Sequence, residues 1–183
     1  MDDAELVRKV VDGEHDAFRE LVLRYERPLF RFFARFGFAP TVREDLAQET
    51  FLRAYRALES FEPARGSLAA WLFTIARNLA ADERARARHQ GEVQAVDVAT
   101  ETPSREDGPA ELNERAEILA RVQRALEGLP GALHSTFVLA EIKDLSLVDV
   151  ARIERCALGT VKSRVHRARE QLRAALGEKE RSR

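Results

Sequence analysis

The sequence predicts an all-α protein built from two small helical units. Apolar residues recur at steps of three and four along most of the 183 residues, and no run alternates convincingly with the period of two typical of strands. The aromatic residues are unevenly placed, because nine of the ten Phe, both Tyr and the single Trp precede residue 74. Charge is uneven as well, with a net charge of zero over 1–90, −5 over 91–113 and +4 over 114–183. Two units of different character, joined by an acidic tether, account for both asymmetries.

The stretch 91–113 is the predicted tether. It contains six acidic residues and one basic residue, together with Pro103, Gly108 and Pro109, and it lacks apolar periodicity. Segments of this composition behave as flexible linkers, and structureless loops of this length are uncommon inside compact domains. We therefore expect a first domain over 1–90, a flexible linker over 91–113 and a second domain over 114–183.

The apolar periodicity predicts eight helices, with boundaries good to a few residues. A capping box at Thr41 is expected to open the third helix, Ser67 to cap the fourth and Ser146 to cap the seventh. Pro28 should kink or split the second helix. The expected ranges are 3–12, 14–36, 41–59, 68–88, 112–127, 131–142, 146–154 and 159–176.

Several function classes are excluded by what the chain lacks. No stretch approaches the roughly 20 apolar residues that cross a bilayer, and the first residues are acidic, so we expect no membrane insertion and a cytoplasmic protein. A single cysteine, Cys156, leaves no internal disulfide and no multi-cysteine zinc site, and the four histidines are dispersed. With no metal-ligand spacing, phosphate-binding glycine loop or catalytic set, we expect no metal, no cofactor and no enzyme.

The helix over 41–59 carries two distinct faces. Its apolar stripe runs through Ala47, Phe51, Ala54, Tyr55 and Leu58 and predicts the side that faces the core. On the opposite side, a leucine lies at the centre of a group of charged and polar residues. This arrangement favours a docking face for a basic partner helix. An ordinary charged surface is the alternative. The members of this face are Asp45, Gln48, Glu49, Leu52 and Arg56.

The helix over 68–88 carries a row of arginines, formed by Arg77, Arg84 and Arg88, with small residues between them. Such a row suits a phosphate backbone, because bulky side chains would hold the helix away from the strand. Trp71 is either core or part of a platform for an unstacked base, and the preceding loop 62–67 could form a pocket for that base. The alternative is an exposed charged helix face. The candidate nucleic-acid residues here are Arg65, Ser67, Trp71, Thr74, Arg77, Asn78, Arg84 and Arg88.

The last predicted helix is basic on its outer side. With the short helix before it, it forms a helix-turn-helix pattern, in which the second helix enters the major groove of DNA. Arginine and lysine there can reach guanine edges, and free backbone N–H groups at the helix start can bind a phosphate. The alternative is that the basic face of this helix binds no partner. The candidate residues are Thr160, Lys162, Ser163, Arg164, His166 and Arg167.

Four segments, in order and over nearly the whole chain, resemble the bacterial sigma factors of the extracytoplasmic-function (ECF) group, the smallest members of the sigma-70 family. The first three resemble the start of region 2, the polymerase-clamp segment and the part that reads the −10 promoter element, and the fourth resembles region 4, which reads the −35 element. These segments are Phe18–Tyr25, Glu44–Tyr55, Gly66–Arg84, and Leu129-Pro130 with Gly159–Arg169.

The resemblance implies a promoter-specificity subunit of RNA polymerase. It implies that the face of 41–59 contacts the clamp coiled coil of the largest polymerase subunit and that region 4 rests on the flap of the second-largest subunit. It also implies that the loop 62–67 receives a base of the −10 element, that the last helix faces the −35 major groove, and that an anti-sigma factor controls the protein.

Departures from the family pattern lie mainly in the second unit. His134 stands where arginine is usual, and Glu154–Ala157 replaces the usual turn before the last helix. Burying a lone carboxylate is costly, so we expect either a shifted turn or a Glu154 paired with a group such as an arginine. Two other function classes stay open at this point: a plain helix-turn-helix regulator, and a polymerase-docking protein that does not read promoters.

Overall fold

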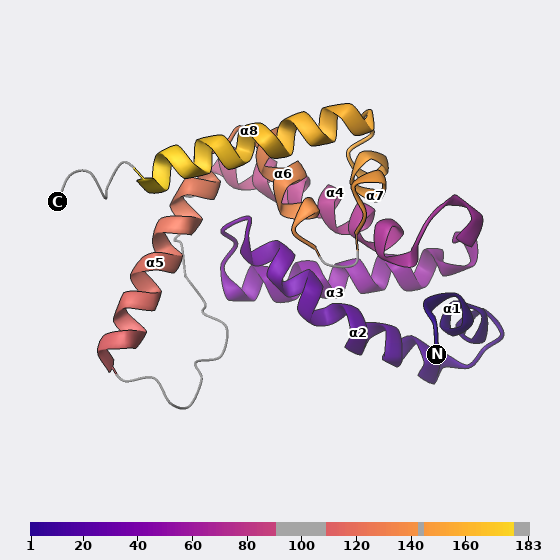
Figure 1. Ribbon diagram of the computed structural model, residues 1–183. Coiled ribbons are helices and arrows are strands. Elements are labelled where there is room, and N and C mark those ends of the chain that lie inside the picture. Colours follow the sequence, from indigo (N-terminus) through magenta and orange to yellow (C-terminus); the bar gives the residue numbers. More distant parts are fainter. Residues whose placement is uncertain (91–108, 143–144, 178–183) are drawn as a thin grey trace.

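The computed structural model describes residues 1–90, 109–142 and 145–177, and regular structure in these ranges is helical throughout (Figure 1). The predicted all-α fold is confirmed. The first unit consists of α1 (Asp3–Val11), α2 (His15–Ala34), α3 (Pro40–Ala57) and α4 (Leu68–Gln90), with the short 3₁₀ turns η1 (Leu58–Ser60) and η2 (Pro63–Arg65) between α3 and α4. The second consists of α5 (Pro109–Glu127), α6 (Gly131–Ala140), α7 (Leu147–Ile153) and α8 (Leu158–Gly177).

Helix starts follow the expected capping residues in two cases of three. The Ser67 hydroxyl accepts a 3.1 Å hydrogen bond from the Ala70 N–H, and Ser146 forms a full capping box with Asp149. The capping box expected at Thr41 was wrong, because α3 begins one residue earlier with Ala39 as its N-cap and without a side-chain cap. Pro40 takes the first helical position, where its fixed φ suits the helix and its missing N–H costs nothing.

Aromatic side chains of α2, of the segment that follows it and of α4 form the centre of the first unit. Phe32, Phe33, Phe38 and Phe73 are almost completely buried, and the rings of Phe32 and Phe73 meet edge to face at 5.5 Å. Pro28 lies inside α2 without splitting it. The aromatic-rich composition before residue 74 thus builds one packed layer between α2 and α4.

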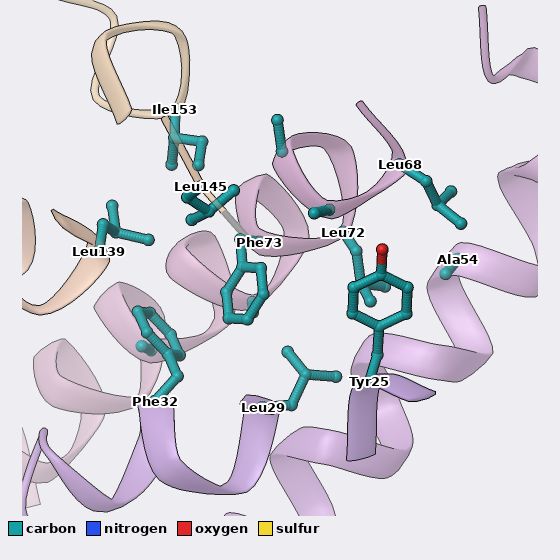
Figure 2. Close-up of a cluster of buried hydrophobic side chains, with 14 of the residues drawn as sticks. Tyr25, Leu29, Phe32, Ala54, Leu68, Leu72, Phe73, Leu139, Leu145 and Ile153 are labelled. Carbon is teal, nitrogen blue, oxygen red and sulfur yellow. The ribbon is translucent and has the colours of Figure 1, made fainter. Parts of the chain in front are cut away.

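The second unit packs on this layer instead of standing apart. Figure 2 shows Leu139, Leu145 and Ile153 directed toward Phe32 and Phe73, and all five belong to one buried hydrophobic cluster. α7 packs against α4, while α5 packs on α8 and reaches the first unit near its C-terminal end, where Gln123 Nε2 lies 3.5 Å from the Arg35 carbonyl oxygen (Figure 1). The structure therefore places the helix-turn-helix directly beside the arginine row of α4.

The predicted linker lies almost wholly outside the described residues. α5 begins at Pro109, within the stretch 91–113 assigned to the linker. Among the described helices, none combines the length and apolar character that crossing a membrane requires.

Candidate nucleic-acid interface

The docking face predicted on α3 lies on the surface. Leu52 is 43% exposed, Asp45, Gln48 and Arg56 are exposed, and Glu49 is half-buried and bonded to Arg53 at 2.7 Å. The other side of α3 is buried in the first unit. An exposed leucine framed by carboxylates is suited to a partner helix that offers apolar and basic side chains together.

One member of the predicted core stripe of α3 was assigned wrongly. Tyr55 is 41% exposed, and its hydroxyl shares a 2.9 Å hydrogen bond with Nδ1 of His15. Its ring packs on the edge of Phe18 at 4.9 Å. Tyrosine counts as an apolar residue in the helical pattern, yet its hydroxyl can stay in contact with water. The periodicity alone therefore could not show whether Tyr55 lies in the core or at its edge.

A hollow of about 220 Å³ lies where the loop 62–67 meets the start of α4. Trp71 lies at its wall, half-buried, with its ring 5.6 Å from that of Phe61. Arg65, Ser67 and Thr74 also line it, so the structure brings four of the predicted −10 residues together around one concave surface. An aromatic wall beside hydroxyl groups is the chemistry that holds an unstacked base.

Three arginines of α4, predicted to face DNA, line a groove between the units, and two of them contact the second unit. Arg77 approaches Glu154, with 3.5 Å between Nε and Oε1, and the Arg84 guanidinium donates to Nδ1 of His134 at 2.9 Å. Arg88 is exposed and bonds to the Arg84 carbonyl oxygen at 3.1 Å. Together with Arg164 they line a groove of about 430 Å³ between the two units. Asn78 is exposed.

His134 is fully buried at the contact between the units. Burial first, and the nearby Arg84 charge second, lower the pKa of this imidazole to about 4, against the opposing effect of its hydrogen bond to the Arg35 carbonyl. The ring is therefore neutral at pH 7. Since Nδ1 accepts from Arg84, Nε2–H donates to the Arg35 carbonyl oxygen at 2.9 Å, which assigns the tautomer.

The outer face of α8 is exposed as expected. Lys162, Ser163, His166 and Arg167 are all exposed, and His166 lies 3.4 Å from Glu170 on the same helix. Thr160 is half-buried at the start of the helix. These side chains form a basic surface on one side of the second helix of a helix-turn-helix, as major-groove reading requires.

Arg164 does not belong to that outer face. It is half-buried and turns inward, with Nη1 3.8 Å from Glu154 Oε2 and 3.5 Å from the Thr136 hydroxyl. The Glu154 side chain is only 3% exposed and accepts a hydrogen bond from the Ser135 hydroxyl. Of the two alternatives expected at this turn, a shifted turn or a paired Glu154, the structure shows the paired carboxylate. Arg155 after it occupies the left-handed region at φ +50°.

The contacts between the units were not foreseen from the sequence, and two of them involve α7 and the residue after it. One is the approach of Glu154 to Arg77, and the other is Arg152 of α7, which lines the hollow beside Trp71. Both join residues about 80 positions apart in the chain, and helical periodicity carries no signal for such pairs.

Family models match two parts of the chain. Residues 21–90 match the model described as Sigma-70 region 2, and residues 119–172 match the model described as Sigma-70, region 4. These matches correspond to the helices that carry the docking face, the hollow and the helix-turn-helix. The chain therefore belongs to the sigma-70 family.

Its relatives place it in the ECF group of that family. The RNA polymerase sigma-H factor of Pseudomonas aeruginosa is 37% identical over 95% of this chain and 93% of its own length. The ECF RNA polymerase sigma-E factor of Escherichia coli K12 is 36% identical over 93% of this chain and 92% of its own.

Two solved structures share the fold over nearly the full chain. CnrH, determined in complex with the cytosolic domain of CnrY, superposes with a TM-score of 0.73 at 29% identity, covering 96% of this chain and 97% of that one. The sigma factor RpoE of Bartonella quintana, in complex with the anti-sigma factor NepR, gives a TM-score of 0.68 at 30% identity, covering 87% and 96%.

Proposed function

We propose that the chain binds core RNA polymerase through the docking face of α3 and thereby directs it to promoters. The observation that carries the proposal is Leu52, 43% exposed among Asp45, Gln48 and Glu49 on a helix whose other side is buried. The partner on the polymerase is the clamp coiled coil of the largest subunit. The second unit rests on the flap of the second-largest subunit.

Promoter reading is divided between the two units. The hollow beside Trp71 accepts one base of the −10 element, and the arginine row of α4 binds the phosphates next to it. Extruding a base costs a few kcal/mol, which the hollow and the phosphate contacts must return, so strand opening depends on the correct sequence. The exposed basic face of α8 reads the −35 element through the major groove.

This role does not require the chain to make or break covalent bonds. The polymerase supplies catalysis, and the chain supplies position and sequence selection, so we infer that it is not an enzyme and that it works in the cytoplasm beside the polymerase. Neither a metal ion nor a cofactor is needed for these contacts.

An anti-sigma factor is the proposed regulator. The Bartonella RpoE structure contains such a partner, and RpoE shares the fold of this chain over most of its length. A protein that covers the exposed α3 face would block polymerase binding. Because Leu52 and the surrounding carboxylates are accessible in the isolated chain, that face is open to either partner.

Transcription in vitro tests the proposal. Purified chain and core polymerase, incubated with fragments of the native genome, should yield discrete transcripts that core polymerase alone does not make. Asp45→Ala with Glu49→Ala should abolish them, whereas Glu26→Ala, an exposed change on α2, should not. Transcripts that persist at full level in the double variant contradict the docking role. A plain helix-turn-helix regulator would give no transcripts with core polymerase.

A further inference from the structure

Three helices form the groove between the two units. α4 lines one side, the first turn of α6 lines another, and α8 contributes a single side chain. The volume of about 430 Å³ lies within the range of small-molecule pockets, which is about 300–1,000 Å³. Ala81, Gly131 and Ala132 present little or no side chain to the groove, so the helices leave room there for a ligand.

The lining of this groove is strongly basic. One carboxylate, that of Glu154, accompanies four arginines. It lies 3.5 Å from one of them and 3.8 Å from another. Both separations exceed the roughly 2.7–2.9 Å of a strong charge-assisted hydrogen bond, so Glu154 compensates neither guanidinium fully. We call this space the arginine groove, after Arg77, Arg84, Arg88 and Arg164.

Two of the four arginines form no ion pair with a carboxylate among the residues that the structure describes, namely Arg84 and Arg88. The Arg84 guanidinium donates to the neutral ring of His134 at 2.9 Å and lies over the ring of Phe36. Arg88 bonds to a backbone carbonyl oxygen. Burial first, and the Arg88 charge second, lower the pKa of Arg84, against a smaller opposing effect of Glu127. An anion in the groove would relieve this repulsion between cations.

The first turn of α6 adds backbone donors to the same groove. Its N-cap, Pro130, provides no side-chain cap, and the N–H bonds back to the Pro130 carbonyl begin at Leu133. The N–H groups of Gly131 and Ala132 therefore have no helical acceptor, and both residues are exposed in the groove. A helix N-terminus carries partial positive charge and binds phosphate through such groups. The helix start and the arginines thus favour the same kind of ligand.

We propose that the arginine groove binds a small ligand that carries two or more linked phosphates. Arginine pairs with phosphate through two parallel N–H bonds, which gives both strength and orientation. A single phosphate would fill a small part of the groove, whereas a di- or triphosphate can contact α4 and the start of α6 together. Nucleotides and inorganic polyphosphate share this chemistry. The test of the site uses neither DNA nor polymerase, so its failure would leave the proposed function untouched.

Isothermal titration calorimetry of the full chain with inorganic tripolyphosphate measures the site directly. Salt at about 0.15 M screens weak surface attraction, and divalent cations are left out. Tripolyphosphate should bind with a Kd of about 100 µM or below, and orthophosphate about tenfold or more weakly than that. Absence of tripolyphosphate and ATP binding up to about 1 mM, or equally tight binding of orthophosphate, would overturn the proposal.

ATP distinguishes the two sources of linked phosphates. Tighter binding of ATP than of tripolyphosphate assigns the site to a nucleotide, whose nucleoside adds contacts in the groove. Equal or weaker binding of ATP assigns it to an inorganic polyphosphate.

Arg88→Gln places the binding in the groove. This exposed side chain lines the groove, and its loss should weaken tripolyphosphate binding about five- to tenfold. The matched control is Arg86→Gln on the same helix, where the side chain pairs with Glu83 and does not line the groove. It should bind as the unmodified chain does. Equal weakening by both variants would show a general attraction to positive charge and would contradict the proposal.

Gly131→Asp tests the contribution of the α6 start. A Cβ at this position meets nothing within 4 Å, and an acidic residue in the first turn stabilises a helix, so the variant should fold. Its carboxylate should weaken tripolyphosphate binding about tenfold or more, because it repels phosphate and competes for the free N–H groups. Gly131→Ala adds the Cβ without the charge and should bind normally. With circular dichroism showing intact helices in each variant, undiminished binding by Gly131→Asp would contradict the proposal.

Discussion

Mild acid should destabilise the chain through His134. This imidazole is fully buried, with a pKa lowered to about 4 by burial first and by the Arg84 charge second. In the unfolded chain its pKa returns to roughly 6.5. Between these values the unfolded chain binds a proton that the folded chain does not, so stability is present above pH 6.5 and falls as the pH drops toward 4.

The size of the effect follows from the difference between these pKa values. Each pH unit in that window costs about 1.4 kcal/mol, so moving from pH 7.5 to pH 5 should remove roughly 2 kcal/mol through this group. Stopping at pH 5 keeps most carboxylates ionised. The residue also lies against Phe36, so protonation would place a charge beside an aromatic ring and the Arg84 guanidinium.

Urea unfolding at the two pH values measures the loss, with His134→Gln as the matched control. Glutamine is neutral throughout, so its unfolding free energy should change much less over the same range. The three other histidines are present in both proteins, and their contributions cancel in the difference. Equal losses in the two proteins would refute the assignment of a neutral, buried imidazole at this position.

Two further perturbations test the packing and the helix start. Phe73→Ala removes a fully buried ring from the shared core and should cost about 3–5 kcal/mol in urea unfolding, and a cost below about 1 kcal/mol would contradict that core position. Ser146→Ala removes the capping box of α7 and should cost about 1 kcal/mol, while Ser146→Asp should largely preserve stability. An unchanged midpoint for Ser146→Ala would show that the cap contributes nothing.

Much of the local structure was accessible from the sequence. Apolar spacing located the helices to within a few residues, and Ser67 and Ser146 cap α4 and α7 as expected. The cost of burying a lone carboxylate left two possibilities at Glu154, a shifted turn or a paired carboxylate, and the structure shows the paired carboxylate. These inferences succeeded because they depend on neighbours in sequence or on one residue's own desolvation.

Contacts between the units could not be predicted in the same way. The choice of Arg77 and Arg164 as partners of Glu154 depends on how α7 docks on α4 and α8, and the hydrogen bond from Arg84 to His134 depends on the same docking. Many arginines in the chain could have filled these positions. The three-dimensional arrangement selects among them through apolar residues such as Ile153 that also join the shared core.

Association with core RNA polymerase tests the central claim most directly. The full chain, immobilised and free of any inhibitor, should bind core polymerase at low micromolar concentrations or below, and Leu52→Asp should weaken that binding by about tenfold or more because it places a charge at the apolar centre of the face. The control variant Leu23→Asp, which places the same charge at a more exposed leucine on α2, should bind as the unmodified chain does. Absence of binding by the unmodified chain, or equal binding by Leu52→Asp, would contradict the account.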